Sequence, residues 1–462
     1  MHTRTINYLT DSPSKILGSI CLPLVIVNVL LALTTTLTNQ LYSRFVGQDA
    51  FSVTGYLSAV TTAFANIVAS VMTAAWIKTA HNFAMGDKDV CSQQIFHGIS
   101  AITTVDVGLA LIVLLFCAPI LAVLNIPEAI YTASRTYLVL YILCYLPAPI
   151  AGLFLTIVNG TSSSLRLLWV NIVVVLLNFA AAVLLLAVFK TGIIGLALCT
   201  CLGALLQLLF DFLLFRKAGF CFPLRQMLKK IDWTAVREII RYGFLIALQN
   251  LLCTSGYLLV TFQTNRYLSL EFISVLNVSL PLTGIMSAFG SACLAFCPQN
   301  YGACKTIRLR SFLRLSTVCC VLYGILCFLL YALMGKWYYG RLFEDSQIIA
   351  FGVDFWFWQG LGYIFLSLIY SLRSFLDSVG MSRLSLLSGL GELCGNLLCA
   401  FWLIPQFGNI GRSLAYPSGW FLASFLLICA FISNRKRIFS LYIFLKVSLS
   451  CTQAIKQARF TH

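Results

Sequence analysis

The hydrophobic and polar positions of this chain alternate in long blocks. Runs of about twenty mostly apolar residues recur along it, and a helix of that length crosses the ~30 Å hydrocarbon core of a bilayer. The runs lack the residue-by-residue alternation of a barrel strand, so helices are predicted. Twelve spans are expected, at 16–41, 51–76, 96–124, 134–158, 166–189, 193–215, 242–264, 271–297, 312–335, 347–372, 384–405 and 412–433.

The composition supports a polytopic membrane protein. Of 462 residues, 60% are hydrophobic and 10% are charged, and the mean hydropathy is +0.91. A soluble domain carries about 25% charged residues. The polar start "MHTRTINYLTDSPSK" leads into an apolar run that is too long for a cleavable signal peptide. Most of the 18 cysteines lie in apolar runs, where Cys behaves as a small hydrophobic residue, so neither disulfides nor a metal site are predicted.

The positions of the basic residues predict the orientation. Twelve spans place both termini on one side, and 24 of the 31 Lys and Arg residues fall in the segments on that side. By the positive-inside rule, both termini are expected in the cytoplasm, at a plasma membrane of prokaryotic type. The rule also explains the net charge of +16 without nucleic acid. The seven basic residues assigned to the opposite loops are Arg44, Arg135, Lys190, Arg266, Lys336, Arg341 and Arg412.

The chain contains two similar halves. "LPLVIVNVL" from residue 22 resembles "FLIALQNLL" from residue 244, and "GIIGLAL" resembles "GNIGRSL", which pairs Gly192 with Gly408. Six spans in each half give both the same topology, with a pseudo-twofold axis along the membrane normal. Two such bundles can rock about a central cavity, which is typical of a transporter. We expect an N-terminal bundle (1–215), a cytoplasmic connection (216–241), a C-terminal bundle (242–434) and a basic amphipathic tail (435–462).

The stretch "FCPQNYGACKTIRLR" (296–310) ends the eighth apolar run. Pro298 and Gly302 are expected to break the helix, and Gln299 and Asn300 to hydrogen-bond the freed carbonyls. This stretch resembles the segment after the eighth span of MATE-type multidrug and toxic-compound extrusion transporters. The similarity extends to "LYSRFVGQDAFSVTG" (41–55) and to "FLDSVGMSRLSLLSGLGELCGN" (375–396), and it covers about residues 12–434.

The resemblance implies a secondary antiporter that exports amphipathic or cationic drugs or metabolites against inward Na⁺ or H⁺, with no other cofactor. In much of the family, carboxylates in the first, fifth, seventh and tenth spans form the ion site. The aligned positions here are Thr38, Ala182, Cys253 and Leu366. Because none of them is ionised, the resemblance supplies no ion site and leaves the coupling ion open.

Carboxylates inside the spans are therefore the ion-coupling candidates, because charged groups in a membrane are costly and usually functional. Glu392 is favoured, with structural pairing to Arg373 or Arg383 as the alternative. Asp354 is expected to begin a helix, and Asp106 in the third span has no evident partner. Another carboxylate, at residue 211, is placed at the membrane boundary.

Neutral side chains are candidates for lining a substrate or ion cavity: Asn28, Thr35, Thr38, Asn39, Gln249, Asn250, Thr254, Tyr137, Tyr141 and Trp358. Amide and hydroxyl oxygens can coordinate Na⁺ or a polar substrate, and aromatic faces suit organic cations. The alternatives are hydrogen bonds between helices for the polar residues and core packing for the aromatic ones.

Two rival functions stay open. A flippase for lipid-linked glycans would need a basic cavity, and the sequence places almost no Lys or Arg in mid-span. A structural or sensory relative that has lost transport would explain the missing family carboxylates. An enzyme is not expected, because there is no clustered His/Asp/Glu set and no nucleotide-binding P-loop. The expected partners are a small-molecule substrate and the lipid bilayer, with a monomeric chain.

Overall fold

The computed structural model describes the chain except for residues 1–6, 47, 84–87, 125, 162–163, 218–230, 270–271, 274, 277–278, 280–281 and 460–462. The described part is built of helices and contains no strand. This agrees with a bilayer environment, in which a helix satisfies the hydrogen bonds of its own backbone.

The first half of the chain forms one bundle. Its elements are α1 (Pro13–Val46), α2 (Gln48–Phe83), α3 (Lys88–Leu115), α4 (Cys117–Val123), α5 (Glu128–Tyr145), α6 (Ala148–Thr161), α7 (Ser164–Ala182), the π-helix η1 (Val183–Val188) and α8 (Gly192–Lys217). Pairs of consecutive short elements, such as α5 and α6, together make one predicted span. The six spans predicted for this half are therefore all helical.

The second half forms the other bundle. Its elements are α10 (Trp233–Tyr267), α12 (Thr283–Gly302), α13 (Thr306–Leu342), α14 (Ser346–Ser378), α15 (Ser382–Leu398), the π-helix η2 (Cys399–Leu403), α16 (Ile404–Phe407) and α17 (Asn409–Arg459). α10 begins well inside the predicted connection, of which residues 218–230 lie outside the described part. The predicted tail belongs to the same helix as the last span.

Eleven helical segments among the described residues are long and apolar enough to cross a membrane. The eighth predicted span corresponds to α12, the twelfth helical segment, which is shorter and begins at Thr283 instead of residue 271. With α12 the two bundles hold the twelve predicted spans in an all-α, two-bundle fold. The chain is a multi-pass membrane protein.

The internal repeat is visible in the backbone. η1 begins at Val183 and η2 at Cys399, so each bundle carries a π-helix at the same offset of 216 residues. Gly192 and Gly408 are separated by the same offset, and both have positive φ, at 64° and 51°. Glycine takes this conformation without a steric penalty. The pairing of these glycines predicted from the sequence is therefore confirmed.

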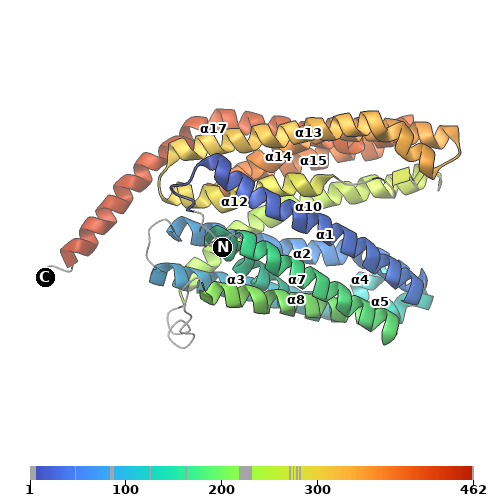
Figure 1. The fold of residues 1–462 in the computed structure, drawn as a ribbon, viewed down its shortest axis with the longest axis horizontal. Coiled ribbons are helices and arrows are strands. Elements are labelled where there is room, and N and C mark those ends of the chain that lie inside the picture. The colour runs from blue at the N-terminus through green and yellow to red at the C-terminus, as the bar shows by residue number, and fades with distance from the viewer. Residues whose placement is uncertain are drawn as a thin grey trace.

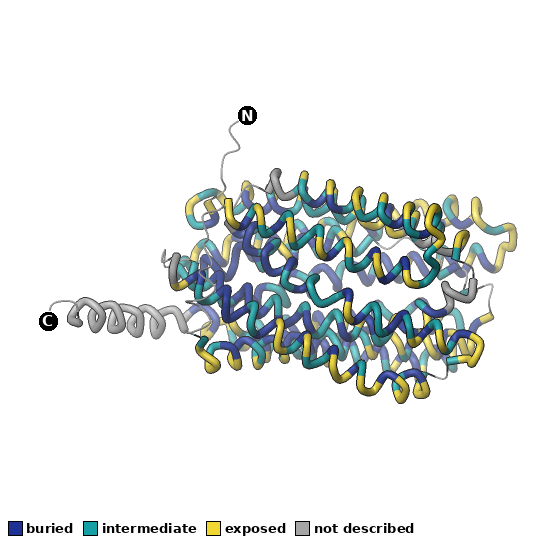
Figure 2. Tube along the Cα trace, turned by 90° about the horizontal axis from the view of Figure 1, so that it is seen from below, coloured by how far each residue is buried: buried dark blue, intermediate teal, exposed yellow. Residues whose placement is uncertain are grey.

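In Figure 1 the two groups of helices come together at the end where the chain enters α1, and they diverge toward the opposite end. We call these the proximal end and the distal end. Buried residues run along the middle of both bundles, and exposed residues lie mainly on the outer faces (Figure 2). Exposed Leu, Phe and Trp side chains on those faces are what a lipid-facing surface requires.

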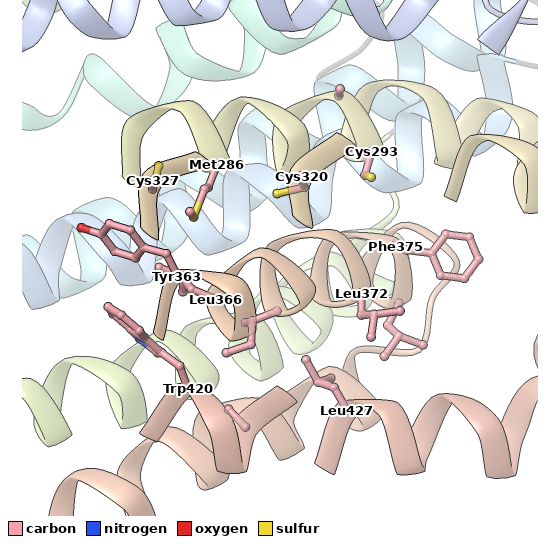
Figure 3. Close-up of a cluster of buried hydrophobic side chains, with 14 of the residues drawn as sticks. Met286, Cys293, Cys320, Cys327, Tyr363, Leu366, Leu372, Phe375, Trp420 and Leu427 are labelled. Atoms are coloured by element: carbon pink, nitrogen blue, oxygen red, sulfur yellow. The ribbon is translucent and has the colours of Figure 1, made fainter. Parts of the chain in front are cut away.

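The cysteines fill core space. Cys293, Cys320 and Cys327 are fully buried in the C-terminal bundle, next to Met286 and Leu366 (Figure 3). Every described cysteine is a free thiol. The prediction that Cys serves here as a small hydrophobic residue is confirmed for the described part of the chain.

The end of α12 differs from the prediction. The helix continues through Pro298 to Gly302, so neither residue breaks it. Pro298 has no N–H, and the carbonyl of Leu294, four residues earlier, accepts from Trp76 Nε1 instead, at 2.8 Å. The left-handed residue of the following turn is Cys304, with φ of 62°. Its turn is closed by a hydrogen bond from Lys305 N to the Asn300 carbonyl at 2.8 Å, the pattern of a Schellman cap.

The segment before α1 is held against both bundles at the proximal end. Asn300 Nδ2 donates to the Tyr8 carbonyl at 3.1 Å, and Lys305 Nζ donates to the Leu9 carbonyl at 2.8 Å. The Tyr8 hydroxyl donates to the carbonyl of Asn159 in α6. A tyrosine from the N-terminal segment thus joins α12 to α6, which belongs to the other bundle.

Arg308 completes this arrangement. Its Nη2 donates to the carbonyls of Tyr8 and Asp11, at 3.1 and 2.6 Å, and its Nε donates to Asn300 Oδ1 at 3.1 Å. We call Tyr8, Asn159, Asn300, Lys305 and Arg308 the proximal clasp. The stretch that ends α12 is therefore also a joint between the bundles.

Direct contacts reinforce the joint. Gln299 Nε2 donates to the carbonyl of Gly160 at 3.0 Å, and His81 Nε2 lies 2.8 Å from the carbonyl of Ser378. Gly302 lies so close to the His81 backbone that a Cβ atom would come within 2.2 Å of its carbonyl oxygen. Only glycine permits this approach, so the bundles are in direct backbone contact at the proximal end.

Candidate functional site

A cavity of about 550 Å³ lies inside the N-terminal bundle, between α1, α6, α7 and α8. Asn28, Thr35 and Thr38 line it from α1, and Asn178 and Gln207 line it from α7 and α8. Asn28 Nδ2 also donates to the carbonyl of Gly284 in α12 at 2.9 Å, so this side chain makes the interhelical bond considered as its alternative role. The described lining consists of amides, hydroxyls and apolar groups.

A carboxylate lies next to the residues that line this cavity. Asp211 in α8 is 0% exposed, so it lies inside the bundle although it stands near the end of its span. Gln207 Nε2 donates to Asp211 Oδ2 at 2.6 Å and lies 3.2 Å from Asn171 Oδ1, and both amides line the cavity. Asp211 Oδ1 is buried and has no hydrogen-bond partner. Sequence position near Arg216 concealed this burial, because helix ends are the least certain part of any span assignment.

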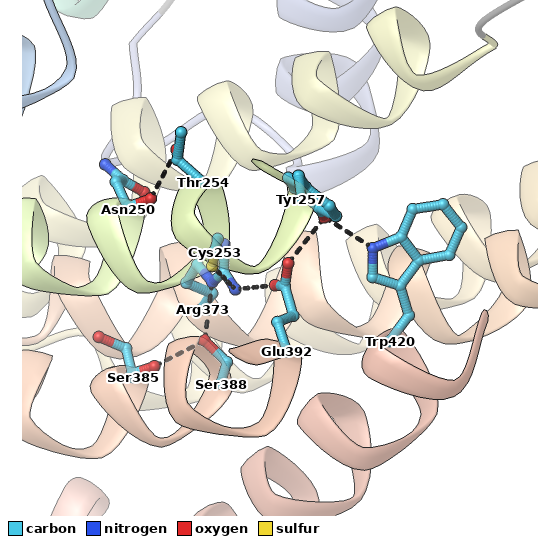
Figure 4. A network of polar contacts seen from close by, with 9 residues as sticks. All are labelled: Asn250, Cys253, Thr254, Tyr257, Arg373, Ser385, Ser388, Glu392 and Trp420. Carbon is cyan, nitrogen blue, oxygen red and sulfur yellow. Dashed lines mark hydrogen bonds and ion pairs between the residues drawn. The ribbon is translucent and has the colours of Figure 1, made fainter. Parts of the chain in front are cut away.

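The C-terminal bundle contains a buried ion pair. Glu392 in α15 is 2% exposed, and its Oε1 accepts from Arg373 Nη2 of α14 (Figure 4). Its Oε2 accepts from the Tyr257 hydroxyl at 2.8 Å, and that hydroxyl in turn accepts from Trp420 Nε1 at 2.9 Å. The pairing with Arg373 considered from the sequence is present. Arg373 follows the span predicted at 347–372, and α14 continues past it to Ser378, so the residue belongs to the helix.

Further side chains contact the guanidinium of Arg373. Its Nε donates to Ser388 Oγ at 2.9 Å, and its Nη2 lies 3.6 Å from Cys253 Sγ. Gln249 is buried beside it, and with its amide oxygen toward the guanidinium it accepts from Nε at 2.8 Å. Cys253 is one of the positions where the family resemblance implies a carboxylate. The acid of this pocket is therefore supplied by α15 and not by α10.

A second cavity, of about 320 Å³, lies farther toward the distal end of the same bundle. Its lining includes Trp356, Gln359, Tyr363, Arg412 and Tyr416. Arg412 is 5% exposed, so its placement in an external loop is wrong. Together with the partly buried Arg373 it puts two cations inside this bundle, which removes the sequence argument against a basic cavity.

The remaining acidic candidates lie elsewhere. Asp106 in α3 is buried, and its Oδ1 has no hydrogen-bond partner. Asp354 does not begin a helix, because α14 starts at Ser346 and its N-cap is Asp345, whose side chain accepts from Gln347 N at 2.7 Å. Asp354 is exposed on the outer face of α14.

The aromatic candidates mainly pack against one another. The rings of Tyr137 and Tyr141 lie next to each other along α5, with centroids 5.8 Å apart and planes tilted by 40°, and neither lines the N-terminal cavity. In α14, Trp356 lines the C-terminal cavity and Trp358 does not. Trp358 packs edge-on against Phe357 at 5.5 Å. The helix period explains this, because residues two apart point to different faces.

The other polar candidates make hydrogen bonds within or between helices. Asn250 Nδ2 donates to Ser70 Oγ at 3.1 Å and so links α10 to α2 of the other bundle. Thr254 donates to the carbonyl of Asn250 in its own helix at 2.8 Å. Asn39 belongs to α1, but its side chain lies outside the described residues.

Two helical bundles related by a repeat, with polar cavities inside the membrane-spanning core, define a polytopic transporter. The profile of the MatE family matches residues 23–184 and again residues 246–402, one match in each half. The chain belongs to the MATE family of membrane efflux transporters. A search of curated proteins finds no match.

Solved structures agree with the fold. A MATE transporter of Vibrio cholerae, VcmN, is 14% identical, with a TM-score of 0.81 over 93% of this chain and 98% of its own. A multidrug resistance MATE transporter described as outward-facing is 14% identical, with a TM-score of 0.80 over 96% and 99%. A transporter of the same superfamily from Pyrococcus furiosus, whose binding pocket is described as having reversed polarity, is 14% identical, with a TM-score of 0.83 over 96% and 99%.

Proposed function

We propose that this chain exports amphipathic or cationic drugs or metabolites by antiport with Na⁺ or H⁺, through alternating access of its two bundles. The observation that carries the proposal is the proximal clasp. It joins the two bundles at one end, while the polar cavities lie inside each bundle beyond that joint. Similar folds include one described as multidrug resistance and outward-facing, which supports the same kind of cycle for this chain.

We also propose that the proximal end faces the cytoplasm. Removing Arg373, which is paired inside α14, from the 24 basic residues of that side, and buried Arg412 from the seven of the other, leaves 23 against six. The bias still satisfies the positive-inside rule. In this orientation the clasp closes the cytoplasmic side of a monomer in the plasma membrane.

Glu392 is the proposed coupling residue. A proton or Na⁺ that binds its carboxylate competes with Arg373 and with the Tyr257 hydroxyl, the two groups that hold it here. Loading the carboxylate therefore releases a side chain of α14 and a side chain of α10. Because Tyr257 also accepts from Trp420 of α17, neutralising one carboxylate loosens four helices of this bundle at once. No cofactor beyond the coupling ion is required.

A flippase for lipid-linked glycans stays the second candidate. The partly buried Arg373 and the buried Arg412 favour it, since phosphate-bearing substrates need positive charge in the cavity. Arg373 is already paired with Glu392, which leaves a single unpaired cation for such a substrate. Transport of a small amphipathic dye, without any lipid-linked acceptor, separates the two candidates.

The test uses the full chain in proteoliposomes loaded with a fluorescent lipophilic cation. An inward Na⁺ or proton gradient is imposed, and dye release is followed over time. We expect gradient-dependent release that stops when an ionophore collapses the gradient. Liposomes without protein give the background. If no cationic or zwitterionic compound moves under either gradient, the proposal is wrong and the reading as a relative that has lost transport is supported.

A further inference from the structure

The C-terminal bundle encloses a cation that has no counterion. Arg412 lines the 320 Å³ cavity and is 5% exposed, and its Nε and Nη1 are buried without hydrogen-bond partners. The guanidinium carbon lies 4.5 Å from the ring centroid of Tyr416 and 5.4 Å from that of Phe355. Aromatic faces attract the cation but accept none of its N–H groups in the plane of the guanidinium.

Other groups of the same cavity also lack partners. Trp356 Nε1 is a buried donor, and Gln359 Oε1 is a buried acceptor, both unsatisfied. The titratable groups that act on Arg412 are Tyr416 and Cys399, and no carboxylate among the described residues does so. Buried polar groups are normally hydrogen-bonded, so a cavity with several unpaired donors is complementary to a ligand that accepts hydrogen bonds.

The local fold forces Arg412 inward at an unfavourable place. α17 begins at Asn409, directly after the positive-φ turn at Gly408, so Arg412 stands in the first turn of a long helix. A helix N-terminus carries partial positive charge and disfavours a cation there. Gly411 lies against the carbonyl of Leu403, where a Cβ atom would come within 2.1 Å, so the start of α17 is in close backbone contact with η2. The contacts with Tyr416 and Phe355 stabilise the guanidinium in part, but they leave its Nε and Nη1 unpaired, and a bound anion would satisfy these donors.

We propose that this cavity is a substrate subsite that binds the carboxylate of a compact aromatic compound through Arg412. The inference rests on the proposed function and selects, among its amphipathic compounds, those that carry a carboxylate. The planar guanidinium fork matches a carboxylate, and Trp356 Nε1 supplies a further donor. Gln359 Oε1 accepts from a hydroxyl or N–H of the substrate.

The other residues that line the cavity indicate the size and the aromatic character of the substrate. Tyr331, Phe355, Trp356, Tyr363 and Tyr416 surround the cavity. A volume of about 320 Å³ lies at the low end of ligand pockets, which extend from ~300 to ~1,000 Å³. A single aromatic ring system with a short carboxylate-bearing chain satisfies both the aromatic walls and this volume.

The subsite is connected to the coupling pair. Arg412, Tyr416 and Trp420 follow one another at intervals of four residues on one face of α17. The Tyr416 ring meets Tyr257 edge-on, with centroids 5.0 Å apart, and the Tyr257 hydroxyl donates to Glu392. A carboxylate that draws Arg412 away from Tyr416 therefore changes the packing of the residue that holds Glu392, which couples substrate binding to the ion site.

Binding to the purified full chain in detergent, measured by calorimetry, tests this inference without transport. The probes are indole-3-acetate and phenylacetate, with indole-3-acetamide and phenethylamine as uncharged and cationic counterparts of similar size. We expect the carboxylates to bind at least tenfold more tightly than the amide and the amine. Arg412→Gln is expected to weaken carboxylate binding at least tenfold, with partial recovery in Arg412→Lys.

Two further variants keep the result decisive. Trp356→Phe keeps an aromatic side chain but removes the Nε1 donor, so it is expected to weaken carboxylate binding several-fold. This variant tests the proposal even if Arg412→Gln fails to fold. Arg341→Gln, at an exposed arginine stacked on Trp337, is the matched control and is expected to bind as wild type. Equal binding of carboxylate and amide, wild-type binding by Trp356→Phe, or binding of chloride and phosphate but no organic carboxylate would each overturn the proposal. Carboxylate binding without gradient-driven efflux would instead refute the proposed function alone.

Discussion

The two bundles have a similar backbone but differ in the charged groups inside them. In the N-terminal bundle, amides and hydroxyls line the cavity, and Asp211 behind them keeps one oxygen without a partner. In the C-terminal bundle, Glu392 is fully engaged by Arg373 and Tyr257. At the repeat offset of 216, Asp211 corresponds to Leu427, a buried core residue. The two halves therefore share the π-helices and glycine turns and differ in their polar groups.

The largest effect is expected from breaking the paired acid. Glu392→Gln leaves Arg373 buried without its counterion, and removing one partner of a buried pair costs about 3–5 kcal/mol. We expect a loss of that size in the stability of the C-terminal bundle, together with loss of gradient-driven efflux. Thermal unfolding in detergent, followed by size-exclusion chromatography, measures the first effect, and the proteoliposome assay measures the second.

Replacing both partners separates stability from transport. In Arg373→Met with Glu392→Leu, no charge stays buried, and such replacements are neutral or stabilising by about 1–4 kcal/mol. The double variant is therefore expected to unfold at or above the wild-type temperature and yet to lose coupled efflux. A double variant as unstable as Glu392→Gln would show that the ion pair is not the source of the difference between the bundles.

The next effect concerns the joint between the bundles. Arg308→Ala removes hydrogen bonds from a cation to the carbonyls of Tyr8 and Asp11, each worth about 1.5–3 kcal/mol. We expect the population with an open proximal end to rise at least tenfold. Maleimide labelling of Cys introduced at buried Ser70, in a background without other cysteines, reports the opening.

The control for the clasp is Arg314→Ala, an exposed arginine on the same helix. It is expected to leave the labelling rate unchanged. Equal labelling of wild type and Arg308→Ala would show that the clasp does not hold the bundles together. The two bundles would then have to be treated as one rigid body.

A smaller effect is expected in the N-terminal bundle. Asp211→Asn keeps the oxygen that accepts from Gln207 and removes no ion-pair partner, so we expect a stability change below about 1 kcal/mol. The same unfolding assay gives the value. A loss as large as that of Glu392→Gln would mean that Asp211 is ionised and has a counterion, and the contrast between the bundles would disappear.

The smallest effect is expected at Asp354. Its side chain is exposed on α14 and neither caps the helix nor lines a described cavity. Asp354→Asn is expected to leave stability within about 0.5 kcal/mol of wild type and efflux unchanged. Loss of efflux in this variant would place a functional acid on the outer face of the bundle. That result would contradict the proposal that the coupling acid lies inside it.

The sequence predicted the spans, the repeat and the family, because long apolar runs and glycine positions are local signals. It selected Glu392 as a carboxylate inside a span and offered Arg373 or Arg383 as its partner; the structure shows the pair with Arg373 and adds Tyr257, which the sequence did not indicate. It did not locate Asp211, Arg373 or Arg412 in the interior, since each lies near a span end, where the apolar pattern fades. Nor could it distinguish Trp356 from Trp358, because the helix phase that turns one toward the cavity is set by packing between α13, α14 and α17.

The central claim is that ion coupling has moved from the family positions to Glu392. The most direct test compares wild type with the Arg373→Met, Glu392→Leu double variant in proteoliposomes under an imposed proton gradient and, separately, a Na⁺ gradient. The double variant is chosen because it is expected to keep its fold. We expect wild type to release its substrate under one of the two gradients and the double variant to release it under neither. Equal gradient-driven release from both proteins would contradict it.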